Sequence, residues 1–224
     1  MQDWIIYAVA IFLFFLTHSI PVRPANKARI VHLMGRRGFT LGYSALSIAA
    51  LSLVIIAANR APIVQLWPWA PWQNHVTLLA MAVATTIAAL AIARPNPLSF
   101  GGRNNHLFDP QAPGIVGWIR HPLLMALLLW ALGHLVPNGN LAHVILFGVF
   151  GGFSILAMKL FDRRKKRMLG EAEWQGLTEK VAKAPFWSIP QSWVDLGFRI
   201  AAGGLVFLLL LKLHPVALGV SPMP

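Results

Sequence analysis

The chain has 224 residues, of which 57% are hydrophobic and 12% are charged. A water-soluble domain is nearer half apolar and a quarter charged, so the apolar excess predicts contact with lipid. Cysteine is absent, which excludes disulfides, thiolate catalysis and thiolate metal ligands. The formal net charge of +12 would suggest a nucleic-acid partner in a soluble chain, but its distribution along this chain indicates a different role.

Six apolar stretches are candidates for membrane spans. A span needs about 20 mostly apolar residues to cross roughly 30 Å of hydrocarbon, and the candidates are residues 4–20, 41–58, 75–93, 115–136, 141–161 and 196–213. Pro21 and Pro24 are expected to end the first helix, because proline lacks the amide donor that a helix interior needs. The sequence Pro-Asn-Gly-Asn at 137–140 predicts a tight turn between the fourth and fifth spans. We therefore expect one all-α membrane domain over residues 1–224 with six transmembrane helices.

The basic residues indicate how these spans are oriented. Of the 19 lysines and arginines, only Arg60 and Lys212 fall outside the loops after the first, third and fifth spans or the span ends beside them. Basic loops stay on the cytoplasmic side, so both termini are predicted to be periplasmic in a bacterial inner membrane. The positive charge is then a topology signal, and the expected partner is the lipid bilayer and not nucleic acid.

The stretch 168–184 has a different periodicity from the spans. Trp174, Leu177 and Val181 share one helical face, while acidic and basic residues occupy the other faces. This pattern predicts an interfacial amphipathic helix on the cytoplasmic surface.

Histidine is the only abundant residue type that could act as a catalyst or ligand, because cysteine is absent and acids are few. His18, His75, His121 and His134 lie within or at the ends of apolar stretches, where ionisable groups are costly and often functional. The alternative interpretation of each is an interhelical hydrogen bond or an interfacial role. The other four histidines are interpreted as solvated or interfacial: His32, His106, His143 and His214.

Spacing limits which histidines could share a metal. His121 and His134 are thirteen residues apart on one predicted helix, about 20 Å of rise, so one iron cannot bind both. A haem with two imidazole ligands needs histidines from different helices. The predicted topology places His18 toward the cytoplasm and His134 toward the periplasm. By depth alone, His18 with His121, or His75 with His134, would pair more easily.

A series of short motifs extends from the N-terminus to about residue 161: Thr17-His18-Ser19, Pro21 and Arg23, Gly35-Arg36-Arg37-Gly38, Leu66-Trp67, His75, Arg120-His121-Pro122, Trp130, and Gly133-His134-Leu135 followed by Asn138-Gly139. In this order and spacing the motifs resemble the NnrU family, whose name comes from an association with genes for nitrite and nitric-oxide metabolism. The family is also similar to zeta-carotene isomerase, an integral membrane protein with haem b.

The resemblance implies an inner-membrane protein that binds haem b and acts in or supports nitrogen-oxide metabolism such as denitrification. It implies His18 and His134 as axial ligands, with His75 and His121 as secondary polar residues of the cofactor site. The isomerase has a cysteine three residues before its second histidine, where this chain has Ala131. The resemblance therefore carries neither thiolate ligation nor carotene isomerisation to this chain.

A second set of residues is similar to the C-terminal half of isoprenylcysteine-type membrane methyltransferases: Arg120-His121-Pro122, Asp162-Arg163-Arg164, Leu169-Gly170-Glu171 and Trp174. This similarity implies an S-adenosylmethionine site at the cytoplasmic face, around Arg120, His121 and Glu171. The chain departs from that family at Trp174, where the family has tyrosine. A third hypothesis is a non-enzymatic accessory factor for a respiratory complex, for which no motif is diagnostic.

Overall fold

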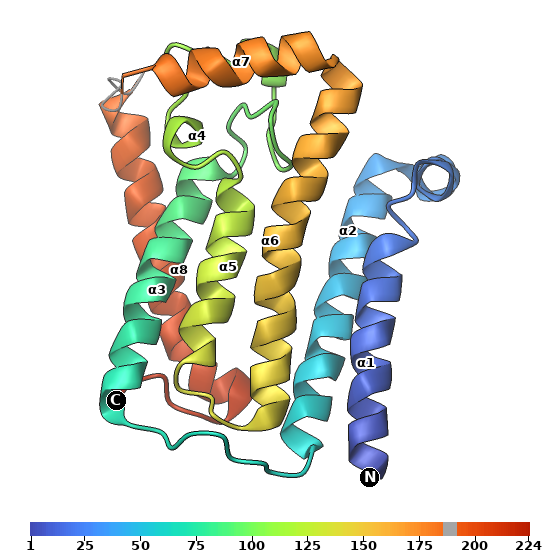
Figure 1. Cartoon of the computed structure of the whole chain (residues 1–224), viewed down its shortest axis with the longest axis vertical. Helices are drawn as coiled ribbons and strands as arrows, with labels where there is room; N and C mark the ends of the chain where they lie inside the picture. Colours follow the sequence, from blue (N-terminus) through green and yellow to red (C-terminus); the bar gives the residue numbers. More distant parts are fainter. Residues whose placement is uncertain (186–191) are drawn as a thin grey trace. The chain divides into compact units, whose positions relative to one another are not determined.

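The computed structural model describes residues 1–185 and 192–224, and this part of the chain contains helices and no β-strand beyond one isolated bridge. The helices are α1 (Gln2–Ser19), α2 (Pro24–Arg60), α3 (Pro71–Ala91), α4 (Ile115–Trp118), α5 (Pro122–Leu135), α6 (Leu141–Leu169), α7 (Glu171–Lys183) and α8 (Trp193–Leu218), with a single 3₁₀ turn, η1 (Asn105–Leu107) (Figure 1). The all-α prediction is confirmed for the described residues.

Five of the helices, α1, α2, α3, α6 and α8, are long and apolar enough to cross a membrane. The chain is therefore a multi-pass membrane protein by length and composition. The predicted fourth span, 115–136, is instead divided into α4 and the 14-residue α5. At about 1.5 Å per residue, α5 is about 21 Å long, shorter than a usual span.

The division before α5 has a local cause. Proline disfavours the helical conformation of the residue before it, because its ring crowds that residue's backbone. His121 accordingly has φ −117° and ψ 66°, and Pro122 begins α5, where its missing N–H costs no helical hydrogen bond.

The second predicted span also differs from the structure, because α2 begins far before residue 41. The predicted basic loop after α1 is largely helical, from Pro24 onward, and the only non-helical residue within α2 is Gly35 with φ +74°. Glycine adopts a positive φ without steric cost, which explains the kink at this position.

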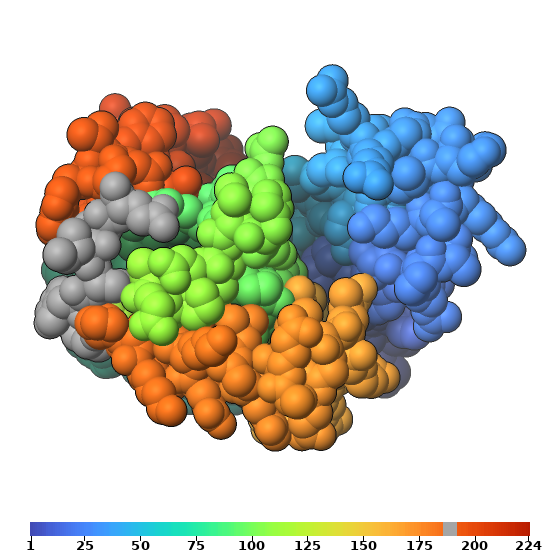
Figure 2. Space-filling view, turned by 90° about the horizontal axis from the view of Figure 1, so that it is seen from above, coloured from blue at the N-terminus to red at the C-terminus, as the bar shows by residue number. Residues whose placement is uncertain are grey.

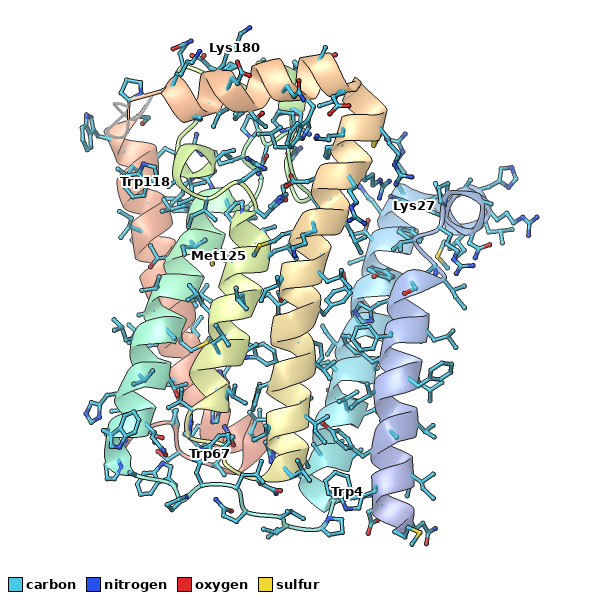
Figure 3. All side chains as sticks on the ribbon, in the orientation of Figure 1. Trp4, Lys27, Trp67, Trp118, Met125 and Lys180 are labelled. Carbon is cyan, nitrogen blue, oxygen red and sulfur yellow. The ribbon has the colours of Figure 1, made fainter. Side chains whose placement is uncertain are left out.

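The chain divides into two compact units. Unit 1 comprises Met1–Pro68 and Gly139–Leu146, and unit 2 comprises Trp69–Asn138 and Phe147–Pro224. In unit 1, α1 packs against α2, and the buried Tyr7 hydroxyl donates to the carbonyl of Ala142 at 2.7 Å. Trp4 and Trp67 lie at the end of this unit where α1 begins (Figure 3), as expected for indoles at a membrane interface.

In unit 2, α3 packs against both α5 and α8. The approach of α3 to α5 is close at Gly133, where an added Cβ would lie 2.7 Å from the Ala80 Cβ, and the Thr77 hydroxyl donates to the Gly133 carbonyl at 2.7 Å. The beginning of α3 therefore lies beside the end of α5, so these two helices are antiparallel. Gly133 thus fixes the position of the neighbouring His134.

Helix α7 lies across one end of unit 2, which we call the α7 end (Figure 1). Its apolar residues Trp174, Leu177 and Val181 pack with Leu98 and Val116 of the preceding loops. Viewed from this end, α7 and the green segment before α5 cover much of the unit, and Trp118 and Lys180 both lie here (Figures 2 and 3). A helix is present at the predicted position, and its apolar face contacts the protein itself.

Candidate functional site

A polar cluster is centred on His121 at the α7 end of unit 2. His121 is 6% exposed, its Nδ1 lies 2.9 Å from the Ser99 hydroxyl, and its Nε2 lies 3.1 Å from an Asp162 carboxylate oxygen. The other oxygen of Asp162 accepts a hydrogen bond from Arg120 at 3.0 Å. We call Ser99, Arg120, His121, Asp162 and Trp174 the His121 cluster.

Asn96 organises the loop that supplies Ser99. Its side-chain oxygen accepts from the backbone N–H groups of Leu98 and Ser99, and its side-chain amide donates to the Arg120 carbonyl at 3.1 Å. A side-chain oxygen that accepts from the N–H groups two and three residues later is a turn that asparagine commonly forms. The bond from the Asn96 amide attaches this loop to Arg120, the residue before His121. Ser99 is 3% exposed, so its hydroxyl is held against the imidazole and away from solvent.

The hydrogen bonds define the protonation of His121. A carboxylate only accepts, so the imidazole N–H must be on Nε2 facing Asp162, and Nδ1 then accepts from the Ser99 hydroxyl. Burial lowers the pKa of His121, and the Arg120 charge adds to this, while Asp162 raises it. The net direction is downward, so the imidazole is neutral at pH 7.

Two cations flank the indole of Trp174. The Arg120 guanidinium carbon is 5.3 Å and the Lys166 amine is 4.7 Å from the ring centre, and Lys166 also pairs with Glu171 at 3.1 Å. The indole Nε1 is the one buried side-chain polar atom without a hydrogen-bond partner among the described residues. The ring is thus held by cation–π contacts and apolar packing.

A second candidate site surrounds His134, in the last turn of α5 at the opposite end of unit 2. Its Nδ1 lies 2.8 Å from the Trp130 carbonyl, and its ring centre is 5.5 Å from Trp130 and 5.3 Å from Phe147. The His214 ring of α8 lies 6.4 Å away, centre to centre. His134 therefore has aromatic rings on one side and a second imidazole nearby.

His18 and His75 share the ring orientation of His134. The Nδ1 of His18 lies 2.8 Å from the Phe14 carbonyl, and that of His75 lies 3.2 Å from the Pro71 carbonyl, each four residues earlier in its helix. His18 belongs to unit 1 and stacks on Phe14 with ring centres 3.9 Å apart. His75 is exposed in the first turn of α3.

The structure separates the four predicted histidines. His121 and His134 lie at opposite ends of α5, as their spacing predicts, and His75 lies at the His134 end because α3 and α5 are antiparallel. Neither the proposed role of His18 nor its pairing with His134 is decided by this arrangement, because His18 lies in the other unit.

Sequence reasoning missed Ser99 and His214. Ser99 carries no signal in the sequence, because its partner is 22 residues away across an irregular loop. From the sequence, His214 is interpreted as solvated or interfacial. Its position directly after the last predicted span, on the same predicted side of the membrane as the end of the fourth span with His134, was a usable signal. Within the described residues, no group of three or more histidine, aspartate or glutamate side chains could bind a metal ion.

The fold and the two histidine sites define a multi-pass α-helical membrane protein with imidazoles at both ends of one short apolar helix. The model of the NnrU protein family matches residues 6–222, nearly the whole chain, and the chain belongs to this family. No curated protein and no solved structure matches the chain. The match continues past residue 161, so α7, α8 and His214 are included in the family domain.

The lowered pKa of His121 predicts the pH dependence of stability. The unfolded chain takes up a proton at His121 near its ordinary pKa of about 6.5, whereas the folded state takes it up only at lower pH. The contribution of neutral His121 to folding stability is therefore fully present above about pH 6.5 and is lost as the pH falls below it. In thermal unfolding in detergent, we expect the wild type to lose more Tm between pH 7 and pH 5 than His121→Asn. Equal losses would contradict a buried, neutral His121.

Proposed function

We propose that this NnrU protein binds haem b with His134 as an axial ligand and acts in or supports nitrogen-oxide metabolism, nitrite and nitric oxide being the relevant compounds. The observation that supports the proposal is the hydrogen bond from His134 Nδ1–H to the Trp130 carbonyl at 2.8 Å. A histidine that ligates a metal usually donates its other ring N–H to a carbonyl or carboxylate. Nε2 is then unprotonated and available to iron.

The surroundings of His134 suit a porphyrin. Trp130 and Phe147 are within 6 Å of the imidazole centre, and Trp130 also contacts Phe150 at 5.6 Å, which gives an apolar wall. His134 is one residue before the end of α5. A bound haem would supply a one-electron redox centre whose potential the axial imidazole and its hydrogen bond adjust.

The resemblance assigns the second axial position to His18. The ring of His18 has the same Nδ1 bond to its own helix, and Tyr43 lies at its edge with ring centres 5.8 Å apart. Each of these two imidazoles therefore has the protonation that a ligand to iron needs. His75 and His121 are proposed as secondary residues of the site.

Haem binding is tested by the visible spectrum. We expect protein purified in detergent from haem-replete cells to show a Soret band that shifts on reduction. His134→Ala should reduce the haem content at least tenfold, because a bond to iron is lost, whereas His106→Ala, at an exposed histidine outside the site, should retain it. A colourless, folded wild type would contradict the proposal.

We also propose that the protein lies in a bacterial inner membrane with the α7 end cytoplasmic and both termini periplasmic. The bias of basic residues supports this orientation. Because the chain has no cysteine, single variants carry one thiol each. The test uses two residues in loops, Ile63 at 79% exposure and Leu107 at 63% exposure.

An impermeant maleimide added to spheroplasts should label Ile63→Cys and leave Leu107→Cys unlabelled. Inverted membrane vesicles should give the opposite result. Labelling of Leu107→Cys from outside the spheroplasts would reverse the proposed orientation.

A second candidate function is S-adenosylmethionine-dependent methyl transfer at the α7 end. It is favoured by one observation: the residues of the methyltransferase-like motifs gather around His121, with Arg120 and His121 both bound to Asp162 and Arg120 over Trp174. Glu171 joins the same region through Lys166.

This second candidate predicts saturable S-adenosylmethionine binding by the purified protein. Arg120→Ala should weaken binding at least tenfold, because the guanidinium both positions Asp162 and stacks on Trp174. Arg103→Ala, in the same loop region but outside the cluster, is the control. Binding that does not saturate, or that is insensitive to Arg120, would exclude methyl transfer at this site.

A further inference from the structure

The rings of His134 and His214 lie near each other within unit 2, although 80 residues separate them in the sequence. Their ring centres are 6.4 Å apart and their planes are inclined by 26°. His134 lies in the last turn of α5, and His214 lies near the C-terminal end of α8. Both helices pack on α3. Both side chains are half-buried.

The same nitrogen is occupied on each ring. His134 Nδ1 lies 2.8 Å from the Trp130 carbonyl, and His214 Nδ1 lies 2.8 Å from the Val220 carbonyl. A carbonyl accepts, so Nδ1 is the protonated nitrogen of each neutral ring. Both Nε2 atoms are then unprotonated acceptors, and two acceptors do not hydrogen-bond to each other. This is the protonation that two imidazole ligands of one metal require.

The separation of the rings matches two ligands on one metal. With metal–nitrogen bonds of about 2.0 Å and about 1.1 Å from each nitrogen to its ring centre, two imidazoles on opposite sides of an ion have centres about 6.2 Å apart. The observed separation is 6.4 Å.

Two protein ligands suit haem better than a bare ion. A structural or catalytic zinc takes three or four protein ligands, and the described residues of unit 2 contain no group of three histidine or acidic side chains that could supply them. A porphyrin supplies four nitrogens of its own, so two imidazoles complete the coordination.

The C-terminal tail holds His214 in place. Helix α8 ends at Gly219, whose φ of +75° turns the chain back so that the Val220 carbonyl reaches the His214 ring. The carbonyl of Met223 then accepts from the Asn74 side chain of α3 at 3.1 Å, and Trp69 donates to the same asparagine at 3.0 Å. The tail is thus attached at the His134 end of unit 2.

We propose that His214 is the axial ligand opposite His134, so that unit 2 alone supplies both imidazoles of the haem site. This inference rests on the proposed function, and it differs from the family resemblance in the identity of the second ligand. His18 then has a structural role in unit 1, where it packs between Phe14 and Tyr43.

The test compares His214→Gly with His18→Gly in the 224-residue chain, with His106→Gly, at an exposed histidine of unit 2 outside the site, as a control. Each protein is purified in detergent, checked for monodispersity and helix content, and examined by visible and electron paramagnetic resonance spectroscopy. A haem with two imidazole ligands is six-coordinate and low-spin. Removing one ligand should give a high-spin, five-coordinate spectrum, and added imidazole should restore the low-spin form if the site is still folded.

We expect His214→Gly to become high-spin, to lose haem affinity at least tenfold in a haemin titration, and to be restored by imidazole. His18→Gly and the control His106→Gly should stay low-spin. If the wild type is low-spin, two results overturn this inference and leave the proposed function intact. One is a high-spin His18→Gly, and the other is a His214→Gly that stays low-spin. A wild type that binds no haem overturns both.

Discussion

Several polar side chains within the apolar helices of this protein are satisfied by the backbone of the same helix. The hydroxyls of Thr86 and Ser154 each donate to the carbonyl four residues earlier, and the Nδ1 atoms of His18, His75 and His134 do the same. An unsatisfied polar group in hydrocarbon costs several kcal/mol, and no water is available there to replace the missing partner. Local donation removes that cost for each residue.

For threonine and serine this arrangement completes the hydrogen bonding of the side chain, but for histidine it does not. An imidazole has two nitrogens, and fixing Nδ1–H on the helix leaves Nε2 as a directed acceptor. The constraint that makes histidine tolerable in an apolar helix therefore also prepares it as a ligand. At His134 and His214 two imidazoles with the same protonation lie near each other, with ring centres 6.4 Å apart.

His121 is satisfied differently, because Pro122 interrupts the helix before it. With no preceding helical turn to accept its N–H, the ring binds side chains from distant elements, Ser99 and Asp162. The result is a buried network that connects the loop before α5, the start of α5 and the end of α6. The two ends of α5 thus carry two kinds of histidine site, one satisfied by side chains and one with an open nitrogen.

The sequence by itself determined the all-helical membrane class, the approximate positions of α1, α3, α6 and α8, the amphipathic character of α7 and the family, because hydropathy, helical periodicity and short motifs are properties of neighbouring residues. It also separated His121 from His134 correctly, since thirteen residues along one apolar stretch set them far apart. The tertiary structure decided that α7 packs on the loop containing Leu98 and that His214 lies near His134. These features depend on contacts between segments 20 to 80 residues apart, and no local pattern specifies which helix faces which.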